Sequence, residues 1–386
     1  MPQVNIILPA YNAEKFIGAA LDSLLNQTFE DFEIFVINDA SLDNTAAICQ
    51  AYADSDPRIR LIHNPGNKGV TKTLNRGLEL ATAPLVARMD ADDIAMPNRL
   101  ERQVAYMREN PDVGVVSSWI RPTTSEGKIY THFGNTPSDD DYLDWAFLFK
   151  NPIAHPAVMF RTELVRSVGG YGQEETLVED YELWSKLHQK TKMHIIPEQL
   201  LIYHIHAQSV SNRNTIRQSL AATRVAKFNI ENFLGQPVDF NATAVIHYAG
   251  LSFQTAYKQA DILAAINLLE ALYAKFTTER SLKPETLAYV HGDLHELLQP
   301  ILLSLPLNER LSILRGNRFV KTVLDRKALL ASVYDWKKTG RALLGKKAKL
   351  VIPEPNFQLI NGAGSPPKGV SNNSGQSVRA LLSGVS

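Results

Sequence analysis

Short apolar runs alternate with amphipathic helical segments from residue 4 to residue 118, and this alternation restricts the fold more than any other feature of the chain. Buried parallel strands are short continuous apolar runs, whereas surface helices place apolar residues three and four positions apart. The predicted strands are residues 4–8, 33–37, 59–62, 85–89 and 113–118. The helices predicted between them are residues 14–25, 41–53 (with Asp43 as N-cap), 71–80 and 97–107. We therefore expect an α/β fold with a mostly parallel, Rossmann-like sheet that helices cover on both faces.

The pattern becomes less regular after residue 118. A loop or hairpin is predicted over 123–135, helices over 139–149 and 179–189, and strands over 157–160 and 200–205. From about residue 211 only helical spacing remains. This part contains one apolar stripe, made of Ile262, Ile266, Leu269, Tyr273 and Phe276, and then a predicted helix pair over 284–305.

We divide the chain into three parts on this basis. An α/β domain covers residues 1–210, a helical region with a basic end covers 211–350, and a tail covers 351–386. The tail is rich in Gly, Ser, Asn and Pro. Such a composition cannot bury enough apolar surface to stay ordered, so we expect the tail to be disordered.

Composition and charge exclude several classes of protein. The chain has 40 basic and 40 acidic residues, so no overall positive field favours nucleic acid. Cys49 is the only cysteine, which excludes intramolecular disulfides and a cysteine-based zinc site. No apolar run is long enough for a transmembrane helix, and residues 4–8 are too short for the apolar core of a signal peptide. We expect a cytoplasmic protein, because the single cysteine suits a reducing compartment.

Ligands of open α/β sheets bind at the carboxyl ends of the strands. In this chain those positions are residues 9–12, 38–39 and 90–93. The last of them contains Asp90 and Asp92, and Mg²⁺ or Mn²⁺ prefers such carboxylates together with the phosphates of a substrate. An isolated Asp-x-Asp is more often a solvated turn. The strand before it, and Asp39 after the second strand, favour a metal site.

Four further residues have both a functional and a structural interpretation. Asp39 can accept hydrogen bonds from a nucleoside or cap a helix. Asp180 lies in the acidic first turn of a predicted helix, where a carboxylate stays ionised and can act as a general base, although such acidic turns are common. Lys72 can neutralise a phosphate or belong to a solvated helix face. His206 follows His204 on the same face of a strand end, and it can contact a metal or diphosphate or be an ordinary surface histidine.

Taken together and in order, these segments resemble the family 2 inverting glycosyltransferases of the GT-A fold, over roughly residues 2–210. The segments concerned are 4–12 (VNIILPAYN), 36–45 (VINDASLDNT), 64–75, 89–93 (MDADD) with 97–100 (PNRL), 151–160 (NPIAHPAVMF) and 178–184 (VEDYELW). Several motifs in the expected order are more specific than any one of them. The helical region after residue 211 lies outside the resemblance.

The resemblance implies a metal-dependent, hexosyltransferase-like enzyme of glycan, polysaccharide or glycolipid synthesis in the cell envelope. Its donor would be a nucleoside diphosphate sugar, with a UDP-sugar favoured, and its acceptor a hydroxyl of a glycan or lipid-linked molecule. Carried over by position, Pro9, Tyr11 and Asp39 would line the nucleotide pocket, Asp90 would contact the ribose or metal, Asp92 would bind Mn²⁺ or Mg²⁺, Asp180 would be the catalytic base, and His206 would lie near the diphosphate and metal.

Two other functions are compatible with acidic residues on an α/β sheet. A nucleotidyltransferase would need a Gly-rich basic loop after the first strand, where this chain has residues 9–12 (PAYN). A nucleotide-sugar-binding protein without activity is disfavoured because Asp39, Asp92 and Asp180 are all present. A dinucleotide-dependent oxidoreductase is excluded, since no G-x-G-x-x-G follows the first strand.

Basic residues are concentrated near the end of the helical region. Residues 309–349 contain twelve Lys and Arg but three acidic residues, interleaved with apolar ones. Such helices can lie in a membrane interface with their basic residues near anionic headgroups. The same pattern fits a soluble helical appendage. The first interpretation predicts peripheral contact with the cytoplasmic face of a membrane, where a lipid-linked acceptor would be found.

Overall fold

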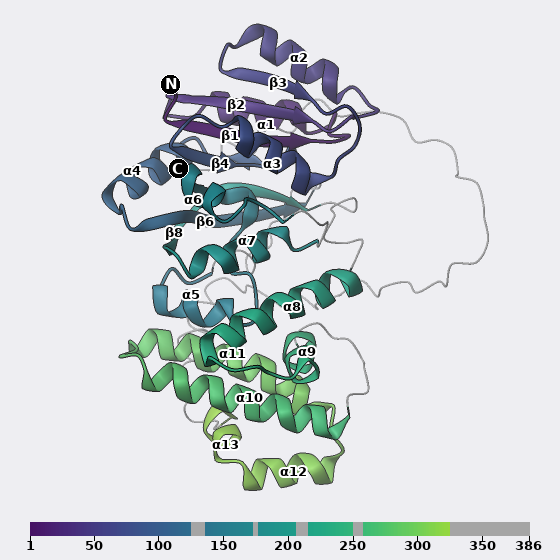
Figure 1. Ribbon diagram of the computed structural model, residues 1–386, viewed down its shortest axis with the longest axis vertical. Helices are drawn as coiled ribbons and strands as arrows, with labels where there is room; N and C mark the ends of the chain where they lie inside the picture. The colour runs from purple at the N-terminus through teal and green to yellow at the C-terminus, as the bar shows by residue number, and fades with distance from the viewer. Residues whose placement is uncertain (125–135, 173–176, 206–214, 250–257, 325–386) are drawn as a thin grey trace, which may run out of the picture. The chain divides into compact units, whose positions relative to one another are not determined.

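The computed structural model describes residues 1–124, 136–172, 177–205, 215–249 and 258–324 (Figure 1). All of them belong to one compact unit, Met1–Val333. Four sequence predictions fall wholly or largely outside these ranges: the loop or hairpin at 123–135, the site residue His206, the basic segment from residue 325 to residue 349, and the tail at 351–386. The proposed domain boundary near residue 210 stays a prediction.

The α/β part is built on one eight-stranded sheet (Figure 1). Its strands are β1 (Val4–Ala10), β2 (Phe32–Asn38), β3 (Ile59–His63), β4 (Leu85–Arg88), β5 (Ile94–Ala95), β6 (Val113–Thr124), β7 (Met159–Arg161) and β8 (Lys192–Ile205). They lie in the order β3-β2-β1-β4-β7-β6-β8-β5. The first four strands of this order pair in parallel, whereas β7 is antiparallel to both its neighbours and β5 is antiparallel to β8. The predicted α/β class with a mostly parallel sheet is confirmed.

Strand β8 is longer than its sequence suggests. It begins at Lys192, whereas the apolar run predicts a strand only from residue 200. Its register against β6 shifts so that Ser118 faces Ile196 while Trp119 faces Gln199. Pro197 lies in the skipped part, and proline in a sheet is confined to edges and bulges because it cannot donate to the ladder. The proline therefore interrupts the pattern without ending the strand.

The helices before residue 210 are α1 (Ile17–Leu25), α2 (Thr45–Ser55), α3 (Val70–Leu80), α4 (Arg99–Glu109), α5 (Asp140–Phe147), α6 (Thr162–Ser167) and α7 (Glu179–His188), with a short 3₁₀ helix at His155–Ala157. The N-cap of α2 is Asn44, so the prediction of Asp43 is wrong. The Asp43 carboxylate accepts hydrogen bonds from the backbone N–H groups of Thr45 and Glu14, and thereby joins α2 to the loop before α1.

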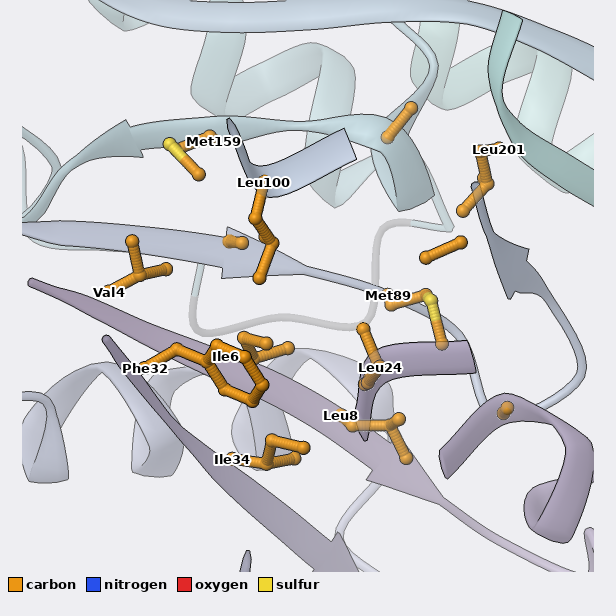
Figure 2. Close-up of a cluster of buried hydrophobic side chains, with 14 of the residues drawn as sticks. Val4, Ile6, Leu8, Leu24, Phe32, Ile34, Met89, Leu100, Met159 and Leu201 are labelled. Atoms are coloured by element: carbon orange, nitrogen blue, oxygen red, sulfur yellow. The ribbon is translucent and has the colours of Figure 1, made fainter. Parts of the chain in front are cut away.

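Side chains that alternate along β1 divide between the two faces of the sheet. Ile6 and Leu8 belong to a buried cluster with α1, α2 and α4, and Figure 2 shows how they lie beside Leu24 and Leu100. Ile7 belongs to a second cluster with α3, α5, α6 and α7. Burial of each such aliphatic side chain contributes about 1.5–3 kcal/mol, so both helical layers hold the sheet.

The helical region follows with α8 (Thr215–Leu234), α9 (Phe240–Ala249), α10 (Gln259–Thr278), α11 (Pro284–Leu303), α12 (Leu307–Gly316) and α13 (Arg318–Leu324). The stripe predicted on α10 is confirmed, since Ile262, Ile266, Leu269 and Phe276 are buried in its core. Residues 284–303 form one helix with Pro300 inside it, so the predicted helix pair is wrong. Tyr142 and Trp145 of α5 belong to the same core, which joins this region to the α/β part.

No helix among the described residues is both long and apolar enough to span a bilayer.

Candidate functional site

Three carboxylates meet just beyond the end of β4. Asp90, Asp92 and Asp93 each place one oxygen within 4.8 Å of the others. Their position follows from the topology, because β1, β2 and β4 run in parallel and end at the same edge of the sheet. The sequence predicted that Asp90 contacts the ribose or metal at this edge and that Asp92 binds the metal. In the structure, the adjacent Asp93 joins these two acids.

Arg88, the last residue of β4, lies beneath the cluster. Its guanidinium pairs with Asp90, although the side chain is almost fully buried. Burial raises the pKa of Asp90 to about 6, with Asp92 and Asp180 adding to the effect and Arg88 opposing it. The Nε and Nη1 groups of Arg88 have no hydrogen-bond partner in the part of the chain that is described. Arg88 is therefore a buried cation in direct contact with the acidic cluster.

Asp93 is the most buried of the three acids. Its Oδ1 atom accepts a hydrogen bond from the backbone N–H of His204 on β8 at 2.9 Å. Its Oδ2 atom is buried and, within the described ranges, has no hydrogen-bond partner. Burial, and then the charges of Asp90 and Asp92, raise the pKa of Asp93 well above its usual range. An uncompensated buried carboxylate is costly, so this oxygen is suited to a cation.

The residues of this cluster fit a divalent ion. All three donors are carboxylate oxygens, which are the hard ligands that Mg²⁺ and Mn²⁺ prefer. The unpartnered oxygen of Asp93 and the mutual repulsion of the three acids would both be relieved by a bound cation. His206, which was predicted as a metal ligand together with Asp92, lies outside the described residues, but His204 of β8 contacts Asp93 through its backbone.

Asp39, at the end of β2, is buried and held by the segment that follows β3. Its Oδ1 atom accepts hydrogen bonds from Asn64 Nδ2 at 2.6 Å and from the backbone N–H of Lys68 at 2.8 Å. Its Oδ2 atom accepts one from the N–H of Gly69 at 2.9 Å. Asp39 therefore shapes the loop of residues 64–69 at this edge of the sheet.

The remaining predicted donor-site residues lie at the same edge with different exposure. Pro9 is half-buried near the end of β1, and Tyr11 follows it with 47% of its surface exposed. Lys72 is exposed in the first turn of α3. Asn12 and Ala40, in the loops after β1 and β2, both have positive φ angles of 50° and 58°. Such angles are unusual for residues other than glycine, although asparagine adopts them more readily than alanine.

Asp180 lies in the first turn of α7 and is half-buried. Asn151 donates a hydrogen bond from Nδ2 to Asp180 Oδ2 at 2.8 Å, and the other carboxylate oxygen accepts from the N–H of Tyr181 at 2.7 Å. Burial raises the pKa of Asp180, and these two hydrogen bonds oppose the rise. Burial, and then Asp180, raise the pKa of the neighbouring Glu179 to about 7.

Arg88 links the acids of β4 to those of α7. Its charge lowers the pKa values of both Asp90 and Asp180, while the charge of Asp180 raises that of Asp90. The charge of Asp180 therefore affects the protonation of Asp90, whereas the roles assigned to these two residues stay predictions.

Three residues of this site were missed by sequence reasoning. Arg88 could have been noticed as the one charged residue of the predicted strand 85–89. Asp93 lies among the predicted strand-end positions 90–93 but was given no role of its own. Asn151 gives no local signal, because its partner is 29 positions away in the sequence.

Comparison with known proteins places this geometry in context. Residues 5–169 match the model of the family described as Glycosyl transferase family 2, a range that includes the Asp90 cluster and ends before Asp180. An uncharacterized glycosyltransferase of Haemophilus influenzae is 32% identical over 244 residues, which are 61% of this chain and 75% of that protein. The O-antigen biosynthesis glycosyltransferase WbnJ of Escherichia coli is 28% identical over 253 residues, which are 64% of this chain and 95% of WbnJ.

A solved structure shares the fold. The mannosyltransferase PcManGT from Pyrobaculum calidifontis, in complex with GDP-Man and Mn²⁺, superposes with a TM-score of 0.51 and 20% identity, covering 84% of this chain and 88% of that one. The likeness confirms the predicted GT-A type fold followed by a helical region.

Proposed function

Because the chain belongs to glycosyl transferase family 2, we propose that it transfers a sugar from a nucleoside diphosphate sugar to a hydroxyl group, with a divalent ion between the diphosphate and the Asp90 cluster. The observation that supports this most strongly is the group of three carboxylate oxygens within 4.8 Å at the end of β4. Without a cation, these acids would repel a diphosphate. The family membership also disfavours the nucleotidyltransferase alternative.

The donor would lie over the ends of β1, β2 and β4. We assign Asp39 with Pro9 and Tyr11 to the nucleoside side, Asp90 to the ribose or metal, and Asp92 with Asp93 to the metal. Exposed Lys72 at the start of α3 is available to the phosphates, and we assign His206 to them on the resemblance alone. A UDP-sugar is the first donor to test, and a GDP-sugar the second, because PcManGT binds GDP-Man.

The reaction we propose is a single displacement at the anomeric carbon of the donor sugar. Asp180 takes the proton of the acceptor hydroxyl as that oxygen forms a bond to the anomeric carbon, and the bond from this carbon to the diphosphate oxygen breaks. A positioned base contributes about 10²–10⁴-fold to such a step. A bound divalent ion would stabilise the negative charge of the leaving nucleoside diphosphate. The configuration at the anomeric carbon would be inverted.

The acceptor would be a glycan or a lipid-linked intermediate of polysaccharide synthesis. The support is the name of WbnJ, an O-antigen biosynthesis glycosyltransferase whose length this chain covers almost completely.

A thermal-shift panel tests the proposal. Each UDP-sugar and GDP-sugar is added with Mn²⁺, with Mg²⁺ or with EDTA, and the midpoint of unfolding is measured. A cognate donor should raise the midpoint only when metal is present, because a ligand that binds the native state stabilises it by mass action. Stabilisation by a nucleotide sugar in EDTA that equals the stabilisation in Mn²⁺ would contradict the proposed role of the metal.

A further inference from the structure

Helix α8, the first helix after the resemblance ends, contacts α7 through a buried polar group. Tyr181, which follows Asp180, is buried and donates a hydrogen bond from its hydroxyl to the carbonyl oxygen of Phe147 at 2.7 Å. Asn229 of α8 donates from Nδ2 to the same carbonyl at 2.7 Å and to Ser185 Oγ of α7 at 2.9 Å. The Asn229 amide also lies 3.4 Å from the Tyr181 hydroxyl oxygen. The Asn229 side chain thus connects two successive turns of α7, at Tyr181 and Ser185, with the end of α5.

A second contact lies at the beginning of α7. Gln218 of α8 donates from Nε2 to the carbonyl oxygen of Leu177 at 3.1 Å. Leu177 has a φ angle of 63°, which is unfavourable for leucine, and it precedes the turn that contains Asp180. A hydrogen bond from outside the turn therefore helps to keep this backbone in place.

These two contacts lie on the same face of α8. Gln218 and Asn229 are close to three helical turns apart, so their side chains project in the same direction. Between them, the small residues Ala221, Ala222 and Val225 pack against the cluster that contains Tyr181 and Trp184. Small side chains allow a close approach between the two helices, and the polar contacts fix the register along them.

We propose that Gln218 and Asn229 are positioning residues for Asp180, so that α8 belongs to the catalytic machinery although it lies beyond the segment that resembles the family. The inference rests on the proposed role of Asp180 as base. This role differs from general stabilisation of the fold, because α8 contacts the helix that carries the proposed base, Asp180. The described donor-binding residues of the proposal lie on β1, β2, the loops after β1, β2 and β4, and the start of α3, and neither side chain is hydrogen-bonded to them in the described ranges.

The test compares Asn229→Leu with Asn232→Leu in the full-length protein. Leucine has the same number of side-chain heavy atoms and the same branch at Cγ as asparagine, but donates no hydrogen bond. Asn232 is on the same helix, is exposed and serves as the matched control. Donor affinity and the number of binding sites per chain are measured by calorimetry, and kcat is divided by that number to correct for any unfolded protein.

The proposal expects a reduction of corrected kcat by about 10–100-fold in Asn229→Leu, with donor affinity within about twofold of the wild type, because small displacements of a reacting group are costly. Tyr181→Phe should lower kcat as well, and the double variant should lose less than the product of the two single losses. Asn232→Leu should retain the wild-type kcat.

The pH profile separates positioning from simple loss of folded enzyme. If α7 shifts, Asp180 loses part of its hydrogen bond from Asn151, which stabilises the ionised form. The pKa of Asp180 should then rise, and the acid limb of kcat/KM should move to higher pH. The substitution leaves the other charged and titratable side chains around Asp180 in place; these are Arg88, Asp90, Tyr171 and Glu179. A profile that is only lowered, or a corrected kcat equal to the wild type, would overturn the proposal.

Failure of the inference can be distinguished from failure of the proposed function. If Asp180→Asn turns over normally, the assignment of the base is wrong. If Asp180→Asn is inactive while Asn229→Leu keeps the wild-type corrected kcat and pH profile, the base is correct and α8 does not position it.

Discussion

At the scale of single residues, Asp180 has the surroundings that a general base requires. It is half-buried, it accepts hydrogen bonds from Asn151 and from its own helix, and the cation of Arg88 counteracts the effect of burial on its pKa. We expect Asp180→Asn to bind the donor with unchanged affinity and to lose about 10²–10⁴-fold in kcat, because the amide has the same shape but accepts no proton. Calorimetry and a turnover assay check the two parts, and near-native turnover would remove Asp180 from the mechanism.

Glu179 makes the stability of the protein depend on pH. Burial raises its pKa to about 7 in the folded protein from 4.5. Between these two pKa values, the folded state binds more protons than the unfolded state. The free energy of unfolding therefore falls as the pH rises from about 4.5 to about 7. Above about pH 7 the contribution of Glu179 to this loss is complete. One pKa unit corresponds to about 1.4 kcal/mol, so the loss is at most about 3 kcal/mol.

The corresponding prediction concerns Glu179→Gln. Relative to the wild type, this variant should gain stability between pH 4.5 and pH 8, by up to about 3 kcal/mol. Urea unfolding in EDTA at the two pH values measures the change. Glu296→Gln, at an exposed position of α11, is the control. A difference between Glu179→Gln and wild type that is the same at both pH values would contradict the assignment.

Sequence reasoning reached the acids of the site only where they follow a strand or begin a helix. Asp39, Asp90 and Asp92 follow parallel strands that end at one edge of the sheet, and Asp180 lies in the first turn of α7. What the sequence could not supply was the set of partners, since Asn151 and the amides of residues 68 and 69 meet these acids across long separations.

At the scale of elements, α3 packs on β1 more closely than an alanine would allow. A Cβ atom on Gly77 would lie 2.6 Å from Ile7 Cγ2, a stiff part of a buried side chain. We expect Gly77→Ala to destabilise the protein by on the order of 1 kcal/mol, since overpacking costs about 1–3 kcal/mol and exceeds the gain in helix propensity. Chemical denaturation measures it.

The same substitution in α11 provides the control. Gly292 is exposed, and a Cβ atom there would meet nothing within 4 Å. Gly292→Ala should therefore stabilise the protein by about 0.5–1 kcal/mol. If both variants changed stability in the same direction, the close packing of α3 on β1 would not be the cause.

The elements with strong periodicity were predictable, and those fixed by tertiary contacts were not. Strands β1 to β4 and the helices between them follow directly from apolar spacing. The antiparallel direction of β7 and the early start of β8 depend on pairing with β6, which no local pattern contains. Helix α6 has only six residues, too few for a helical period to be evident.

At the scale of the whole molecule, the basic segment of residues 309–349 is divided by the structure. Arg310 donates hydrogen bonds to the carbonyl oxygens of Leu302 and Leu305, and Phe319, Val320 and Val323 are buried with α10 and α11. The first part of the segment therefore belongs to the helical core. The part from residue 325 lies outside the described residues and contains eight of the twelve basic residues.

Membrane contact is tested by a truncation after Leu324, the last residue of α13. If residues 325–386 bind anionic headgroups, the full-length protein should sediment with vesicles that contain phosphatidylglycerol, and less so at high salt, because each basic residue near the surface contributes about 1 kcal/mol. The truncated protein should stay in the supernatant. Equal recovery of both proteins in the supernatant would identify the segment as ordinary solvated surface.

The central claim is that the Asp90 cluster binds a nucleotide sugar through a divalent ion. The most direct measurement of this claim is the release of nucleoside diphosphate from the nucleotide sugar. With a cognate donor and acceptor, we expect release in Mn²⁺ or Mg²⁺, none above background in EDTA, and recovery when metal is restored. Asp92→Ala should lose at least about 10²-fold in kcat, consistent with loss of transition-state charge stabilisation, whereas Asp31→Ala at an exposed position should retain activity. Full activity of the wild type in EDTA, or of Asp92→Ala in metal, would contradict the account.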